Sequence, residues 1–154
     1  MYGSSCRGGE GFHRTSGGMF LDPEMLNITS GVITKILFDD IIPGYTDGIE
    51  DTVNNRLVPG VPGSYLICGQ ISYTEIVPTK NYELKLQENG VIIHQMYEHS
   101  SIILGELTLC FAKIIIVNLD TDFYELYARQ NTGVDTIDIE NGIHYTYLMM
   151  QRIR

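Results

Sequence analysis

The sequence predicts an all-β fold, a jelly-roll β-sandwich of about 8–10 antiparallel strands with an extended N-terminal arm. Ile, Val, Thr and Tyr, which favour strands, are frequent, and Trp is absent. Short apolar runs recur along the chain, and turns rich in Gly, Pro, Asn and Asp separate them. No long stretch has the 3.6-residue period of an amphipathic helix.

The first predicted strands lie between residues 32 and 73. Residues 32–38 form the first β run, and a loop dense in Gly, Asp, Asn and Pro follows it. From Tyr65 to Tyr73 the residues alternate between an apolar face and a mixed face. This period of two predicts a long strand.

A hairpin is predicted in the middle of the chain. Tyr82, Leu84 and Leu86 alternate with polar residues, which is typical of a half-buried strand. Asn89-Gly90 follows and is a strong signal for a two-residue hairpin turn. Residues 91–96 are then expected to return along the first strand.

The last third contains the most apolar runs. Residues 104–109 and 110–117 are apolar enough to be strands buried on both faces. Residues 123–129 and 136–140 predict two further strands. A second Asn-Gly pair, Asn141-Gly142, is expected to turn the chain into a final strand over residues 143–149.

Residues 1–30 differ in composition from the rest. The first twenty residues are rich in Gly and Ser, with too little apolar surface to pack alone. We therefore predict a Gly-rich arm and connector over residues 1–30 and a jelly-roll domain over residues 31–154. The arm is expected to anchor the protein to a partner. Its candidate anchoring residues are Tyr2, Phe12, Arg14, Met19 and Phe20.

Charge and composition exclude several classes of protein. The net charge of −9 argues against nucleic-acid binding, which needs clustered Lys and Arg. No secretory signal is recognised, and no apolar run is long enough to cross a bilayer, so we expect a soluble protein without a membrane partner. Cys68 and Cys110 sit in apolar runs and are expected to be reduced, buried thiols.

No catalytic, cofactor-binding or metal-binding constellation is found, so we predict that the protein is not an enzyme. The four His residues have no ligand spacing, and no serine sits in a nucleophile elbow. Five acidic residues lie in the loop after the first β run, where oxygen ligands could hold calcium. Their spacing matches no defined calcium loop, and solvated turn residues are the favoured interpretation. These residues are Asp39, Asp40, Asp47, Glu50 and Asp51.

The order of several motifs resembles one family of β-sandwiches. These are Pro62-Gly63-Ser64-Tyr65 before an aromatic strand, Asn89-Gly90 in mid-domain, and Asp122, Glu125 and Leu126 before the last hairpin. Over about residues 32–154 the chain resembles the trimeric jelly rolls of the tumour necrosis factor and complement globular-head superfamily. The form found in tailed-phage virion proteins is the most similar. The Leu148-Met149-Met150 ending departs from that pattern.

The resemblance implies a homotrimer, and tyrosines suit such an interface because each has an apolar body and a polar tip. The candidate interface residues are Tyr73, Tyr127, Tyr145 and Tyr147. We expect a virion structural protein on the outer surface of a phage particle, either decorating the capsid or forming part of a fibre. The arm would bind a neighbouring capsid or other virion protein. The alternatives are a receptor- or glycan-binding fibre head and a bacterial surface jelly-roll trimer.

Overall fold

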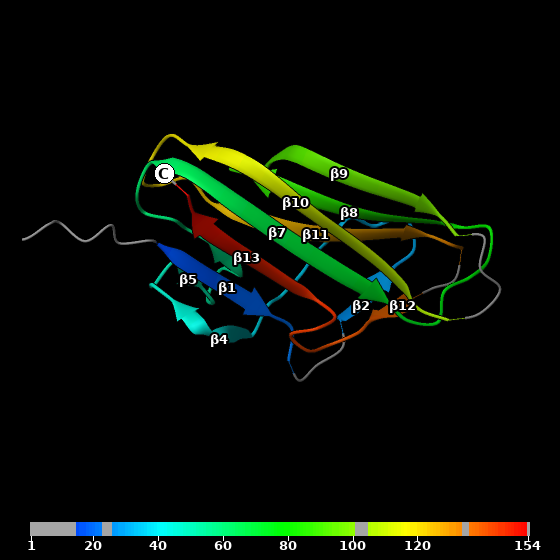
Figure 1. Ribbon diagram of the computed structural model, residues 1–154. Helices are drawn as coiled ribbons and strands as arrows, with labels where there is room; N and C mark the ends of the chain where they lie inside the picture. Colours follow the sequence, from blue (N-terminus) through cyan, green and yellow to red (C-terminus); the bar gives the residue numbers. More distant parts are fainter. Residues whose placement is uncertain (1–14, 23–25, 101–104, 134–135, 154) are drawn as a thin grey trace, which may run out of the picture.

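Two antiparallel β-sheets packed face to face make up the protein (Figure 1). The computed structural model describes residues 15–22, 26–100, 105–133 and 136–153. Within these ranges the regular structure is entirely β, which confirms the predicted all-β sandwich. No helix that could span a membrane occurs in the described ranges.

The described residues form thirteen strands, three of which are only two residues long. The ten longer strands agree with the predicted number of about 8–10. In chain order the strands are β1 (Ser16–Phe20), β2 (Leu26–Thr29), β3 (Thr34–Lys35), β4 (Asp40–Thr46), β5 (Glu50–Asp51), β6 (Arg56–Leu57), β7 (Gly63–Tyr73), β8 (Asn81–Glu88), β9 (Val91–His99), β10 (Leu107–Val117), β11 (Tyr124–Asn131), β12 (Thr136–Ile139) and β13 (Tyr147–Arg152).

The first sheet, called sheet A, has the order β2-β12-β7-β13-β1-β4, and β10 pairs with the other edge of β7. Sheet B has the order β5-β6-β11-β8-β9, and β3 also pairs with β11. β7 and β10 pair along their whole length, from Leu107 opposite Tyr73 to Val117 opposite Gly63. β8 and β9 form the hairpin predicted from Asn89-Gly90.

The hydrophobic core lies between the two sheets. Alternate residues of β7, β8 and β11 point into it, as their period of two predicts. Tyr73 and Tyr82 stack edge to face there, with ring centroids 5.0 Å apart. The largest fully buried side chains include Tyr65, Tyr73, Tyr82, Tyr124, Phe38 and Met19.

The predicted boundary at residue 30 is wrong, because residues 16–20 and 26–29 belong to sheet A. β1 pairs with both β13 and β4, and β2 pairs with β12. Gly17 and Gly18 leave room for neighbouring side chains there. A Cβ at Gly17 would collide with Ile49 and Glu50, so the glycine content reflects close packing at this position.

The second Asn-Gly pair does not form the expected hairpin. β12 and β13 both pair with β7 and follow one another along it, rather than pairing with each other. The intervening residues bulge out, and Gly142, with φ of 106°, donates its N–H to the carbonyl of Leu21. β12 and β13 thus both pair with the same edge of β7.

The first predicted β run is also shorter than expected. Only Thr34 and Lys35 pair as a strand, with β11. Ile36 and Phe38 nevertheless reach the core. The apolar alternation in this run therefore reflects burial rather than an extended ladder.

Candidate assembly surface

The outer face of sheet A, pointing away from the core, carries apolar side chains that no described residue covers. We call this set the apolar face. It consists of Leu66 and Cys68 on β7, Ile114 and Ile116 on β10, and Tyr147 and Met149 on β13. Ile114 is 63% exposed and Ile116 is 58% exposed. Contiguous exposed apolar surface of this kind marks an interaction site.

The strand register places these side chains next to one another. Leu66 lies opposite Ile114 on β10, and Cys68 lies opposite Met149 on β13. Residues directly opposite in paired strands share a face and are in contact range. The apolar face is therefore one continuous surface across three strands.

The sequence predicted that residues 110–117 form a strand buried on both faces, but β10 is buried on only one face. Leu109, Phe111 and Val117 point into the core, but Cys110, Ile114 and their outward neighbours are exposed. Cys110 is thus exposed and Cys68 only half-buried, so neither is the buried thiol that the sequence predicted. The sequence of β10 is typical of a strand covered on both sides, whereas residues 15–22, 26–100, 105–133 and 136–153 cover only one side.

The four candidate interface tyrosines fall in three different places. Tyr147 lies on the apolar face, and Tyr145, which is 42% exposed, precedes it. Burial raises the pKa of Tyr147, and the nearby Cys68 and Cys110 raise it further. Tyr73 is fully buried in the core, where its hydroxyl donates to the carbonyl of Glu83 at 2.6 Å. Its side chain is not available to another subunit, so the interface prediction for Tyr73 is wrong.

Tyr127 lies on the opposite side of the molecule, on the outer face of sheet B. Its hydroxyl donates to the Glu125 carboxylate at 2.9 Å, and that carboxylate also accepts from Lys35. Burial and then the Glu125 hydrogen bond raise the pKa of Tyr127 to about 12. Tyr127 is therefore separated from the apolar face by the whole thickness of the sandwich.

The outer face of sheet B is polar and already occupied by its own ion pairs. Glu83 accepts from Lys85 and from Arg129, each at 2.8 Å, and from Gln95 at 3.0 Å. Glu83 and Lys85 are buried although they point away from the core. Buried charges are tolerated when they are paired in this way. The two faces of the sandwich thus differ sharply in character.

Of the candidate anchoring residues, the structure describes Met19 and Phe20. Both lie in β1 rather than in an arm, and Met19 is part of the core. Phe20 pairs with Tyr147, so it lies on the outer side of sheet A beside the apolar face. The anchoring role predicted for Met19 is therefore wrong, because packing against β13 and β4 holds the residue. Tyr2, Phe12 and Arg14 lie outside the described residues.

The acidic loop has structural partners instead of a metal geometry. Asp47 accepts from the backbone N–H of Ser16 at 2.7 Å, and Glu50 accepts from that of Gly18 at 2.9 Å. Asp51 binds Asn54 and Arg56, and these hydrogen bonds, Asn54 first, lower its pKa. In the part of the chain that the structure describes, no three His, Cys, Asp or Glu residues gather as metal ligands. Asp47 and Glu50 instead fasten β1 to the sheet.

Comparison with known proteins identifies the fold. No protein-family model and no curated protein matches the sequence. The structure of Eiger TNF from S. frugiperda matches with a TM-score of 0.67 at 10% identity, over 92% of this chain and 93% of that chain. Murine APRIL at pH 5.0 matches with a TM-score of 0.64 at 11% identity, over 91% and 99%. The chain has the tumour necrosis factor-like jelly-roll fold.

The tumour necrosis factor-like fold confirms the predicted jelly roll. The matches cover about nine-tenths of the chain. The prediction from the sequence did not include the apolar face, although the sequence contains a signal for it. In residues 107–117 both alternating sets are apolar except for Thr108 and Lys113, and only one of two such sets can face the core of a two-layer sandwich.

Proposed function

We propose that the chain assembles as a homotrimer through the apolar face and acts as a non-catalytic structural and binding head. The observation that carries this proposal is β10, whose two faces are both largely apolar while the described residues cover only one of them. Removing apolar surface from water stabilises by about 25 cal/mol per Å². Other copies of the same chain are always present as possible partners, and most soluble oligomers are closed, symmetric assemblies of identical chains.

A cyclic trimer also requires a second, different surface, because each subunit contacts two neighbours through unlike patches. The edge formed by β9 and β10 supplies one. At the start of β9, Val91 is 64% exposed and Ile92 is 44% exposed, and neither residue belongs to the apolar face. This edge of one subunit and the apolar face of the next would bury each other.

The test is the molar mass of the purified protein in solution, measured by light scattering. We expect about three times the 17.3 kDa of one chain. Ile114→Asp should reduce the mass to that of one chain, because the carboxylate would be desolvated in the contact. Val53→Asp is the matched control, since Val53 is 88% exposed and lies away from the apolar face. A monomeric wild type at micromolar concentration would refute the proposal.

The non-catalytic role is supported by how the polar groups are used. The carboxylates of Glu83, Glu125 and Asp122 are each held by hydrogen bonds or ion pairs within the chain. A catalytic acid or base needs access to a substrate and a tuned environment instead. We therefore expect a head domain that acts by binding other proteins through its surfaces and not by catalysis.

We propose a phage virion as the setting, on the basis of the motif order in residues 32–154 described above. The anchoring segment would then be residues 1–14, ahead of β1. Deleting residues 1–14 should leave a folded trimer that no longer attaches to particles. The deletion must stop there, because β1 is part of sheet A. Normal attachment of the truncated trimer would rule out anchoring by this segment.

Glycan binding would call for exposed aromatic clusters in the loops at residues 43–63 or 97–103. Among the described side chains of these loops, the exposed aromatic one is Tyr97. A cluster is therefore not seen there, and assembly remains the better-supported role.

A further inference from the structure

Three sulfur-bearing residues meet on the outer side of sheet A. Cys68 on β7 lies directly opposite Met149 on β13. On its other side, Cys68 is diagonal to Cys110 on β10, because Cys110 pairs with Gln70, two residues further along β7. All three side chains are on the same face of the sheet.

The neighbours of Cys68 on this face include a small residue and an amide that is hydrogen-bonded elsewhere. Ala112, a small residue, lies opposite Cys68 on β10. The Gln70 amide points elsewhere, since it donates to the carbonyl of His144 at 2.8 Å and to that of Tyr145 at 3.2 Å. Both thiols also lie close enough to the Tyr147 hydroxyl to affect its ionisation.

The spacing distinguishes a disulfide from a metal bridge. Diagonal residues of paired strands have Cα atoms roughly 7–8 Å apart. A disulfide needs about 4.4–6.8 Å between Cα atoms, which is shorter than this typical spacing, and both Cys68 and Cys110 are free in the structure. Two thiolates on one metal ion each bind at about 2.3 Å, which lets the sulfur atoms stand roughly twice that distance apart.

We propose that Cys68, Cys110 and Met149 form a binding site for a soft monovalent metal ion such as Cu(I). Thiolate and thioether ligands select Cu(I) over harder cations. Zn²⁺ would require a fourth ligand, and no cluster of three His, Cys, Asp or Glu side chains exists in the described ranges. Binding forms two copper–thiolate bonds and one copper–thioether contact, and the two thiols release two protons.

The test uses the full-length reduced protein and Cu(I) in the presence of a competing Cu(I) chelator. Copper is supplied both to the folded protein and during refolding, so that contacts between copies do not hide the site. We expect one Cu(I) retained per chain by native mass spectrometry. Cys68→Ser and Cys110→Ser should each lose the ion, and Met149→Leu should release it to a weaker competitor.

Cys6→Ser is the matched control, because it removes the remaining thiol of the chain and should retain the ion. Far-ultraviolet circular dichroism establishes that each variant keeps its β structure. Equal copper retention by the wild type and the Cys68→Ser/Cys110→Ser double variant would overturn the proposal. So would closure of a Cys68–Cys110 disulfide by mild oxidation. Neither result depends on whether the chain is a trimer.

Discussion

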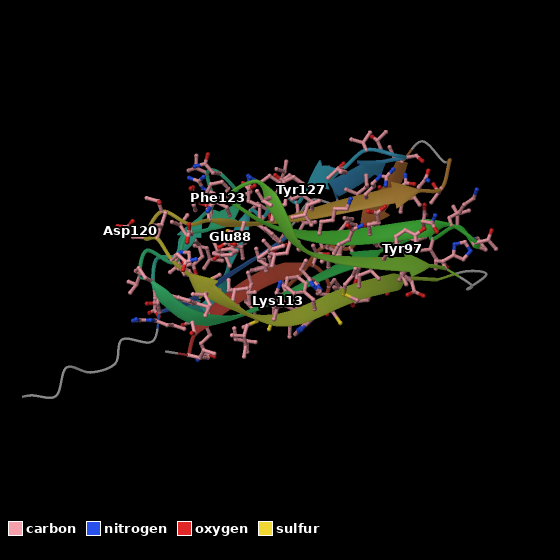
Figure 2. All side chains as sticks on the ribbon, turned by 90° about the horizontal axis from the view of Figure 1, so that it is seen from above. Glu88, Tyr97, Lys113, Asp120, Phe123 and Tyr127 are labelled. Carbon is pink, nitrogen blue, oxygen red and sulfur yellow. The ribbon has the colours of Figure 1, made fainter. Side chains whose placement is uncertain are left out.

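The ammonium N–H of Lys113 on β10 donates a hydrogen bond to the main-chain oxygen of Ile93 on β9 at 2.7 Å, across the edge between the two sheets. Figure 2 looks down on this edge and shows Lys113 beside β9. The β8–β9 register shifts beside Ile93, which marks a bulge. A bulge and an inward-pointing Lys both prevent an edge strand from pairing with another chain. Next to it, His94 packs on Phe111 with centroids 5.2 Å apart.

Replacing Lys113 should therefore affect both stability and solubility. Lys113→Met removes the donor and leaves the Ile93 carbonyl without it, which should cost about 2 kcal/mol of unfolding free energy. Urea unfolding measures the cost, and light scattering on warming measures aggregation. Lys80→Met removes the same charge from a loop and serves as the control. Equal losses in the two variants would contradict the role of the Lys113 bridge.

The ion pairs on sheet B predict a large effect at Glu83. Glu83→Leu would leave the buried Lys85 ammonium without its 2.8 Å partner, and we expect a loss of about 3 kcal/mol or more. The double variant Glu83→Leu/Lys85→Leu should recover most of that loss, because no buried charge remains unpaired. Arg129 is 32% exposed and can turn to water. Chemical denaturation of the single and double variants measures the coupling; simple additivity would argue against it.

Asp122 predicts a pH dependence of stability. The backbone N–H of Leu119, with further hydrogen bonds from Asn89 and Asn118, holds the pKa of this carboxyl below its usual range. The folded-state pKa is thus lower than the unfolded one. The carboxylate therefore stabilises the fold above the unfolded-state pKa, and this contribution is lost as pH falls through the folded-state value.

Unfolding free energies measured between pH 6 and pH 3, about the range where carboxyls titrate, test this. Asp122→Asn should flatten the fall in stability at the acid end and lower the stability at neutral pH. Asp120→Asn, at an exposed position on the same loop, is the control. The idea fails if Asp122→Asn keeps the full acid dependence of the wild type.

Gly69 and Phe111 predict a compensating pair of substitutions. They lie opposite each other in β7 and β10, and a Cβ on Gly69 would come within 2.5 Å of the Phe111 ring. Gly69→Ala should cost about 1–3 kcal/mol through overpacking. Adding Phe111→Leu should make the double variant more stable than the sum of the single effects. Thermal unfolding of the four proteins gives the coupling, and a strictly additive result would show that the contact is unimportant.

Much of the fold followed from local pattern. The alternation in residues 65–73 and 82–87 correctly predicted which side chains of β7 and β8 enter the core, and Asn89-Gly90 correctly predicted the hairpin. β1 was missed, because its Gly17-Gly18 pair resembles a flexible segment. Only the approach of Ile49 and Glu50 explains why glycine is needed there. Residue type alone does not separate Tyr73 and Tyr127 from interface residues, because tyrosine suits both protein surfaces and protein cores.

The sequence by itself determined the direction in which each strand side chain points, since successive residues of a strand face opposite sides. It could not determine which of two apolar faces another layer covers, because the covering strands come from distant parts of the chain. The tertiary structure decided this by placing sheet B against one side of β10 and, among the residues that it describes, none against the other. That pairing of distant strands also brought Cys68, Cys110 and Met149 onto one uncovered surface.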